Sequence, residues 1–423
     1  MPDQPTLQTF HPGPVYFNLK PFADSGQALV PEPMSRVAGA RVVYANYALL
    51  LHDFRSYFEA QLQQPPEALS KAELYAYIDD WLVRHAAVMS RTQAAQSKVN
   101  TPIPISSKSV VGYRPPRYGR AAIVVVPMPD DEQRQLLLDV KGCGVSGAPP
   151  YLIKPLLPNA NGLLTLSEAM HELLMEKVSG LVLAAGHSMA RPLPSYAVLD
   201  LGCDAVFNDG SPNDPAVLTV RRGHARPAFQ WGEAHPGKEV ACQLLEVELL
   251  LRASGLSSSN CGAIRFELAQ YNGQLQVLRD GKAVDAGAAS RIPARWKQAL
   301  AAGQRMVLDG VNVQVDDQLN RGGAQFQILD FGRYRVRSSF SNALFASCHR
   351  NFAALEGAFL DAQHTRYVQP VAGRDLSKLL AGSRVRAFNQ AVVSYNGSDD
   401  ARQRINNALV ALVQRAEQLL MEH

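Results

Sequence analysis

Cysteine is scarce in this sequence, and no two cysteines stand close together. The 423 residues include five cysteines, none of them in a CxxC pair. Scattered cysteines in odd number argue against a disulfide framework and against a zinc knuckle, and they fit a reducing compartment. The five are Cys143, Cys203, Cys242, Cys261 and Cys348.

Long apolar runs are also missing. Apolar stretches such as Leu181 to Gly186 and Leu244 to Leu251 are far too short to cross a bilayer. The first residues, MPDQPTLQTFHPG, have neither the positive n-region nor the apolar h-region of a secretory signal. We therefore expect a cytoplasmic protein with no membrane partner.

Neither sign of charge dominates. The chain has 42 Lys and Arg against 38 Asp and Glu, a formal net charge of +4. Nucleic-acid binding usually needs a basic face or stripe, so we expect no nucleic-acid partner. Hydrophobic residues make up 47% of the chain and charged residues 19%, which is ordinary for a folded protein with a sizeable core. The length suits one large catalytic domain with two lobes.

The N-terminal region predicts an arm followed by helices. The first 40 residues are rich in Pro and Gly, which indicates an irregular surface arm. Residues 42–62 and 69–93 have apolar side chains at three- and four-residue spacing, typical of helices. A stretch rich in Ser, Thr and Pro, Thr101 to Ser109, ends this pattern.

Strand patterns follow. Arg120 to Met128 and Leu136 to Lys141 predict two strands joined by the turn Pro129 to Glu132. Further strands are predicted at Tyr196 to Asp200 and Ala216 to Val220. Between the two pairs the chain has a loop and a helix, which are treated next.

Thr165 to Val178 predicts a helix between these strands, because Thr165 and Glu168 stand in capping-box register. The second half of the chain is more helical, and the overall pattern is of α+β type. Helices are predicted at Lys238 to Ala253, Ser341 to Leu360 and Ala401 to Met421, and strands at Phe266 to Leu278, Met306 to Val315 and Phe326 to Asp330.

Lys141 is the first candidate functional residue. It ends an apolar strand, where a lysine can reach phosphate oxygens as a compact point charge. A lysine extending into solvent is the other interpretation. A helical carboxylate could orient Lys141. Glu168, Glu172 and Glu176 lie near one face of the following helix, and their spacing alone does not choose among them.

A metal site is the second candidate. Asp330-Phe331-Gly332 follows a short apolar strand, as does the Mg²⁺ ligand of kinases. Upstream, Asp316, Asp317 and Asn320 could supply a base and a second metal oxygen, because carboxylate and amide oxygens suit a hard cation. A polar surface turn is the alternative for these three residues.

A basic stretch is the third candidate. Arg221, Arg222, His224 and Arg226 follow a strand. Arginines suit bidentate phosphate binding. A basic loop on the surface would have the same composition.

In this order, these elements resemble the SelO family, the kinase-fold protein adenylyltransferases that bind ATP in a flipped orientation and transfer AMP. The resemblance covers residues 112 to 360, a little over half of the chain. The similar segments are Gly119-Arg120-Ala121, Lys141-Gly142-Cys143-Gly144, His171-Glu172, Ala216 to Arg226, Asp330-Phe331-Gly332 and Asn351 to Leu360.

The resemblance implies a protein-kinase-like two-lobe fold of α+β class, with a small β-rich N-lobe and a mostly helical C-lobe. Residues 1–110 would form the N-terminal arm and helices packed on the kinase-like core. Residues 111–235 would form the N-lobe-like region, and residues 236–423 the helical C-lobe-like region.

The resemblance also assigns roles to residues of this chain. It selects Glu172 as the partner that orients Lys141, and it implies ATP and Mg²⁺ (or Mn²⁺) as cofactors. Asn320 and Asp330 would hold the metal, with Asp317 as base or orienting group. The ATP-binding residues would be Gly119, Arg120, Lys141, Gly142, Arg221, Arg222 and Arg226.

The chain also departs from the family pattern. Arg117-Tyr118 stand before Gly119, where the family has a further Gly-Asp. A second Gly-Asp-Gly is missing between Lys141 and Glu172, and extra residues stand there instead. Leu319 precedes Asn320, where the family has an Asp. The ATP-holding half of the pattern is therefore better preserved than the acceptor half.

Three functions are compatible with these motifs. The first is AMP transfer to a protein hydroxyl. The second is phosphoryl transfer to a protein, peptide or small molecule. The third is a non-catalytic nucleotide-binding scaffold, suggested by the missing Asp before Asn320. No motif identifies the acceptor.

Overall fold

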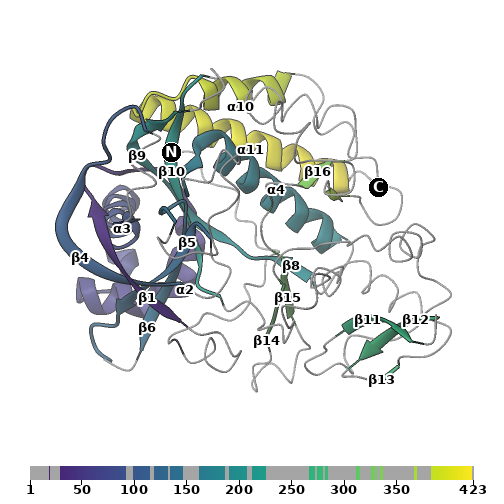
Figure 1. Cartoon of the computed structure of the whole chain (residues 1–423). Helices are drawn as coiled ribbons and strands as arrows, with labels where there is room; N and C mark the ends of the chain where they lie inside the picture. The colour runs from purple at the N-terminus through teal and green to yellow at the C-terminus, as the bar shows by residue number, and fades with distance from the viewer. Residues whose placement is uncertain are drawn as a thin grey trace.

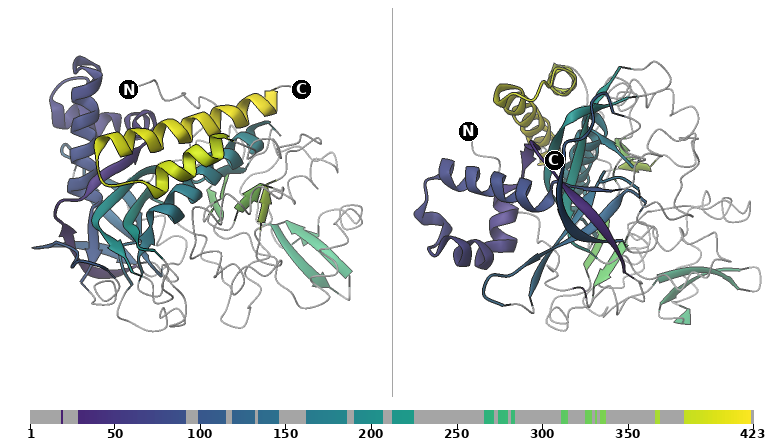
Figure 2. Two further views of the ribbon diagram at one scale, coloured as in Figure 1. Left: turned by 90° about the horizontal axis from the view of Figure 1, so that it is seen from above. Right: turned by 60° about the vertical axis from the view of Figure 1, so that its left-hand side comes forward.

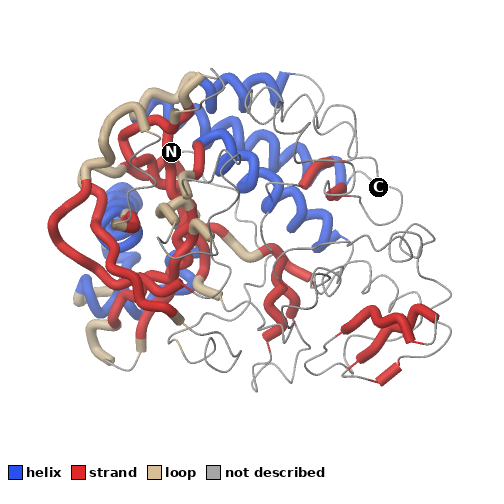
Figure 3. Tube along the Cα trace, in the orientation of Figure 1, coloured by secondary structure: helices blue, strands red, loops and turns tan. Residues whose placement is uncertain are grey.

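A computed structural model shows helices beside a large antiparallel sheet, which is an α+β fold (Figures 1 and 3). The structure describes residues 19, 29–91, 99–114, 119–131, 134–145, 162–185, 190–206, 212–224, 266–271, 274–279, 282–283, 311–314, 325–328, 331, 334–336, 366–368 and 383–421.

The large sheet has the strand order β2-β9-β10-β6-β5-β4-β1-β3, and every neighbouring pair is antiparallel. A two-residue strand, β7, pairs with β10 outside this path. The strands are β1 (Val30–Val37), β2 (Arg41–Ala45), β3 (Val88–Ser90), β4 (Ile105–Arg114), β5 (Ala121–Pro127), β6 (Gln135–Lys141), β7 (Leu164–Thr165), β9 (Ser195–Ala205) and β10 (Asp214–Arg222).

Two helices cover one face of this sheet, which we call the core face. They are α2 (Tyr47–Leu62) and α3 (Lys71–Ala86), joined through the short 3₁₀ turn η1 (Pro66–Ala68). They extend from one side of the sheet in the right-hand view of Figure 2. Their aromatic side chains Phe54, Phe58 and Trp81 pack in one cluster with strand residues such as Leu138 and Val140.

Local sequence sets the limits of both helices. The side chain of Asn46 accepts a hydrogen bond from the Leu49 amide at the start of α2. Ser70 and Glu73 form a reciprocal capping box at the start of α3. Such caps satisfy amides that have no partner within the helix.

The opposite face of β6 and β10, which we call the α4 face, carries a third helix, α4 (Leu166–Ala185). Two C-terminal helices, α10 (Ser383–Val393) and α11 (Asp399–Met421), pack against α4 (Figure 1). Arg402 of α11 also binds Asp79 of α3 and the Tyr47 hydroxyl, at 2.7 and 2.6 Å. These partly buried polar contacts join α11 to α2 and α3.

Three small sheets lie outside the large one. They are β8 (Ala190–Pro192) with β14 (Val311–Gln314) and β15 (Gln325–Ile328), β11 (Phe266–Tyr271) with β12 (Gln274–Arg279) and β13 (Lys282–Ala283), and β16 (Tyr334–Val336) with β17 (Arg366–Val368). None of the helices within the described ranges has both the length and the hydropathy needed to cross a membrane.

Several sequence predictions agree with these elements. The strands predicted at 120–128, 136–141, 196–200 and 216–220 correspond to β5, β6, β9 and β10. The predicted helices at 165–178 and 401–421 correspond to α4 and α11. Strand predictions at 306–315 and 326–330 overlap β14 and β15. The predicted helices at 238–253 and 341–360 lie outside the described residues.

Other boundaries were wrong. The predicted irregular arm includes strand β1, whose Pro31 and Pro33 pair with β4 before the stretch that pairs with β3 begins at Met34. The helix predicted from residue 42 begins only at Tyr47, because Arg41–Ala45 pairs with β9 as β2. A run of apolar residues as short as Val42-Val43-Tyr44 fits both periods, so only the strand partner decides.

The remaining corrections also come from strand pairing. The helix predicted at 69–93 ends at Ala86, and Val88–Ser90 pairs with β1 as β3. The strand predicted at 266–278 is a hairpin of β11 and β12. The predicted domain limit at residue 110 falls inside β4, which pairs with both β1 and β5. Residues on both sides of that limit therefore share one sheet.

Candidate functional site

The register of β6 and β10 determines which predicted residues share a face. Lys141 lies opposite Thr219, and Asp139 lies opposite Arg221. Alternate residues of a strand point to opposite faces. Lys141, Asp139 and Arg221 therefore lie on the α4 face, while Arg222 belongs to the core face.

Lys141 and Glu172 form an ion pair between β6 and α4. The Lys141 ammonium lies 2.5 Å from Glu172 Oε1, and the two side chains are 8% and 10% exposed. An ammonium needs a partner when water is largely excluded. Glu172 supplies it and fixes the direction of the lysine side chain. This is the contact that the sequence resemblance implied.

The neighbouring glutamates of α4 have other partners. Glu168 binds the guanidinium of Arg120, which also donates to the Leu163 carbonyl at 2.8 Å. Glu176 accepts from the Ser195 amide at 3.0 Å and lies 2.8 Å from the Lys177 ammonium. The three glutamates, spaced four residues apart on α4, therefore each have a different partner.

The start of α4 is capped by two side chains. Thr165 Oγ1 accepts from the Glu168 amide at 3.3 Å, in the predicted capping position. Asp214 Oδ1 accepts from the Ser167 amide at 3.4 Å. Because Asp214 belongs to β10, this contact fixes α4 to the sheet beside the Lys141–Glu172 pair. Burial raises the pKa of Asp214 to about 6.

Arg221 forms a buried ion pair with Asp139 on the α4 face. Its Nε and Nη2 lie 3.0 and 2.8 Å from Asp139 Oδ1. His224 Nδ1 lies 3.7 Å from the other oxygen of Asp139. All three side chains are buried, and Asp139 stands two residues before Lys141 on β6. Phosphate binding by Arg221 would have to compete with this ion pair.

Arg222 has a different environment from the one predicted. Its guanidinium binds both carboxylate oxygens of Asp53, which also accepts from the Tyr196 hydroxyl at 2.6 Å. The Arg222 side chain is 1% exposed and lies among the residues of the core face. This placement argues against the predicted contact of Arg222 with ATP, because a ligand would have to enter the core between sheet and α2.

Two turns, residues 119–121 and 142–144, meet beside Lys141. The Arg120 carbonyl accepts from the Gly142 amide at 2.7 Å and from the Cys143 amide at 3.2 Å. Gly142 has φ +95°, and a Cβ on it would lie 2.7 Å from the Val217 carbonyl oxygen. Only glycine fits that conformation and that space. Burial raises the pKa of the Cys143 thiol to about 11, so this side chain is a neutral thiol at pH 7.

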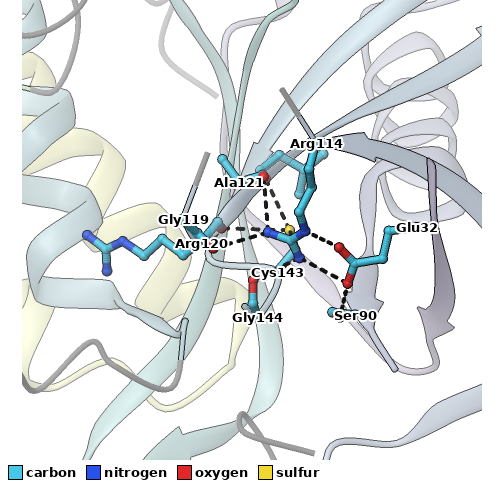
Figure 4. Close-up of polar contacts among 9 residues, drawn as sticks. Glu32, Ser90, Arg114, Gly119, Arg120, Ala121, Cys143 and Gly144 are labelled. Carbon is cyan, nitrogen blue, oxygen red and sulfur yellow. Dashed lines mark hydrogen bonds and ion pairs between the residues drawn. The ribbon is translucent and has the colours of Figure 1, made fainter. Parts of the chain in front are cut away.

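Arg114 contacts both turns, and sequence reasoning missed it (Figure 4). It ends β4 and is 5% exposed. Its guanidinium donates to the carbonyls of Ala121 and Gly144 at 3.1 and 3.0 Å. Glu32 of β1 neutralises its charge. A lone arginine at a strand end carries no sequence signal for this set of partners, because Glu32 and Gly144 lie 82 and 30 positions away along the chain.

The predicted metal site lies outside the described residues, which is also true of the predicted phosphate ligand Arg226. Phe331, between two of the site residues, is described and is 4% exposed. The described residues hold no group of three or more His, Cys, Asp or Glu side chains suited to a metal ion. The residues left out are Arg226, Asp316, Asp317, Asn320, Asp330 and Gly332.

Comparisons of the chain with protein-family models, with curated proteins and with solved structures found no match. The SelO-like interpretation therefore depends on the motifs and on the geometry around Lys141.

Proposed function

We propose that this protein is an ATP- and divalent-metal-dependent transferase with a SelO-like kinase fold, which moves AMP from ATP to a hydroxyl group on a protein. The observation that carries the proposal is the ion pair between Lys141 and Glu172. In kinases the corresponding pair links the third strand of the small lobe to the helix that follows it, and it orients the lysine toward the nucleotide phosphates.

The order of elements supports the same comparison. β4, β5 and β6 are neighbours in the sheet, and Lys141 ends the third of them. Helix α4 with Glu172 follows, and the chain then returns to the sheet as β9 and β10, with β10 beside β6. In this proposal, these elements correspond to the strand, helix and ion pair of a kinase small lobe. A helical second lobe is part of the proposal.

The residues at the site suit a triphosphate. Lys141 supplies a positive charge whose direction is set by Glu172. The turn that follows Lys141 has a glycine where a Cβ would collide with neighbouring backbone, so the chain folds tightly there. Arg120 is held by Glu168 next to the same turn. Arg226 would add a further phosphate contact in this proposal.

Asn320 and Asp330 would hold Mg²⁺ or Mn²⁺, which neutralises phosphate charge during transfer. Asp317 would orient the acceptor hydroxyl or take its proton. The transfer would break the bond between the α-phosphorus and the bridging oxygen, form a bond from the acceptor oxygen to the α-phosphorus, and release pyrophosphate. Positioning and charge neutralisation would supply most of the rate acceleration.

Phosphoryl transfer is the second candidate, because kinases use the same lysine–glutamate pair. ATP labelled in the α-phosphate or in the γ-phosphate separates the two reactions. The protein is incubated with Mg²⁺ or Mn²⁺, each labelled ATP and a mixture of acceptor proteins. Label from the α position together with a nucleotidyl mass gain supports AMP transfer, and label from the γ position supports a kinase.

Binding is measured alongside transfer. A shift in melting temperature with ATP and metal, but no transfer of either label, would support the non-catalytic scaffold. No shift and no transfer would contradict all three functions. Lys141→Ala should abolish the shift and the transfer. Glu176→Gln changes a buried carboxylate of α4 that binds Lys177 rather than Lys141, and it serves as the control.

A further inference from the structure

Arg114 is a buried arginine that joins four separate segments of the chain. Figure 4 shows its guanidinium between Glu32 on one side and the two turns, residues 119–121 and 142–144, on the other. It donates to the carbonyls of Gly119 and Ala121 at 3.3 and 3.1 Å. It donates to the Gly144 carbonyl at 3.0 Å and contacts Cys143 Sγ at 4.0 Å.

Only an arginine can make this set of contacts. The guanidinium has five N–H donors in a fixed plane, whereas a lysine ammonium has three on a flexible stem. A buried guanidinium also needs a counter-charge. Glu32 provides it, since its carboxylate accepts a hydrogen bond from Arg114 Nε. The Ser90 hydroxyl donates to the same carboxylate. Glu32, Ser90 and Arg114 therefore each have a hydrogen-bond partner within the group.

The two turns that Arg114 joins are the ones that carry the predicted nucleotide-binding residues. Gly119 and Arg120 belong to the first turn, and Gly142 directly follows Lys141 in the second. The turns also bond to each other, because the Arg120 carbonyl accepts from the Gly142 amide at 2.7 Å. The Ser90 amide donates to the Cys143 carbonyl at 2.8 Å.

Arg114 and Lys141 point to opposite faces of the sheet. By register, Gly112 of β4 lies opposite Val124, whose side chain is in the core-face cluster. Arg114, two residues further on the same strand, points to the same side. Lys141 points to the α4 face. Arg114 therefore has no direct path to a ligand held by Lys141, and any effect on that ligand must pass through the two turns.

We propose that Arg114, held by Glu32, is a positioning residue: it fixes the two turns relative to each other and so sets the direction from which Lys141 meets the phosphates. The proposal rests on the proposed function. It predicts that loosening the Arg114 contacts weakens ATP binding while Lys141 and Glu172 remain in place.

The matched pair of variants is Glu32→Gln and Asp53→Asn. Each removes one carboxylate charge from a buried arginine on the core face, Arg114 in the first case and Arg222 in the second. The Asp53 pair touches neither turn. Arg114→Lys is added because it keeps the charge but loses the planar fork. For each variant, melting temperature, ATP affinity with Mg²⁺ and amide hydrogen exchange are measured on the full chain.

Glu32→Gln and Arg114→Lys should raise the Kd for ATP by about 10- to 100-fold, by analogy with the loss of groups that orient the protein ligands of a metal ion. The amides of Gly142 and Cys143 should exchange faster in both variants. Asp53→Asn should lower the melting temperature by a similar amount but leave the Kd and these two amides as in the wild type.

An ATP affinity that falls no further in Glu32→Gln and Arg114→Lys than in Asp53→Asn would overturn the positioning role. Unchanged exchange at Gly142 and Cys143 would overturn it as well. A wild-type protein that does not bind ATP overturns the proposed function instead, and the exchange rates alone then decide whether Arg114 holds the two turns together. Glu32→Gln is the milder change and keeps the test usable where Arg114→Lys does not fold.

Discussion

The two faces of the β6–β10 strand pair use buried charge in different ways. On the core face, Arg222 and Asp53 form one ion pair within an apolar cluster that includes Tyr196 and Leu138. On the α4 face, Lys141 pairs with Glu172, and two residues earlier Asp139 pairs with Arg221. Among the described residues of these two strands, the core face has the pair of Arg222 enclosed by hydrophobic side chains, while the α4 face has the neighbouring pairs of Lys141 and Asp139.

We expect this difference to separate charge that serves stability from charge that serves the proposed function. A charged pair in an apolar core is costly to break, because each partner would be left without compensation. A row of pairs under one helix keeps several ionisable groups near one another. Perturbed and closely spaced ionisable groups are typical of functional sites, although structural networks also have them. Variants of the two faces test this distinction directly.

The largest effect on stability is expected on the core face. Asp53→Ala leaves Arg222 buried without its counter-charge, which should lower the free energy of unfolding by about 3–5 kcal/mol. Urea titration followed by far-UV circular dichroism measures this change. A loss below about 1 kcal/mol would mean that water reaches Arg222 in solution.

The opposite pattern is expected for Glu172→Gln. The amide still offers an oxygen to the Lys141 ammonium, so stability should fall by less than in Asp53→Ala. ATP binding or turnover should fall by about 10²-fold, as expected when one electrostatic contact at a reacting group is lost. Isothermal titration with ATP and Mg²⁺, with Glu176→Gln as control, measures it. Equal losses of ATP affinity in the two glutamine variants would contradict a particular role of Glu172 in ATP binding.

An intermediate loss of stability is expected from a substitution in the turn that follows Lys141. In Gly142→Ala the new Cβ would lie 2.7 Å from the Val217 carbonyl at a φ of +95°, so both strain and collision oppose it. Gly39→Ala has a similar φ of +76° but no atom within 4 Å of its Cβ. Strain alone costs about 1 kcal/mol, and collision should raise the cost for Gly142 to about 3 kcal/mol. Chemical denaturation of both variants compares the two costs, and equal values would contradict the close approach.

The smallest effect concerns the cap of α4 on the same face. An unfolded Asp ionises near pH 4, whereas burial raises the pKa of Asp214 to about 6 in the folded protein. The folded state therefore holds the proton to higher pH, and the stability from this group is present below about pH 4 and lost as the pH rises through 6.

Asp214→Asn mimics the protonated carboxyl and should raise the melting temperature by about 1–2 °C at pH 8. The gain should vanish at pH 4, where the wild-type carboxyl is itself protonated. Differential scanning calorimetry at the two pH values measures the difference. A gain of the same size at both values would show that Asp214 does not titrate in this range.

Much of the region around Lys141 could be predicted from local patterns. Alternating apolar residues and a turn predicted β5 and β6, and Thr165 with Glu168 predicted the start of α4. These features depend on neighbours in the chain, so local sequence determines them. Prediction failed at residues 42–45, where a short apolar run fits a strand as well as a helix.

Contacts between distant segments could not be predicted in the same way. Three glutamates share one helix face, and their spacing does not choose among them. The family resemblance pointed to Glu172, and the contact between α4 and β6 shows that it meets Lys141. Period-two alternation separates Arg221 from Arg222, but it does not say which of them faces the core. The pairing of β10 with β6 decides that.

The sequence by itself determined the strands, the helix and the glycine that surround Lys141, because propensity, capping and turn chemistry act within a few residues. Apart from the Lys141–Glu172 pair, which the family resemblance had suggested, the partners of the buried charged side chains came from the tertiary structure alone. Arg114 meets Glu32 across 82 positions of the chain, and Arg222 meets Asp53 across 169. No local pattern records such distances, since the energy of a buried ion pair depends on what folding brings together and on how much water it removes.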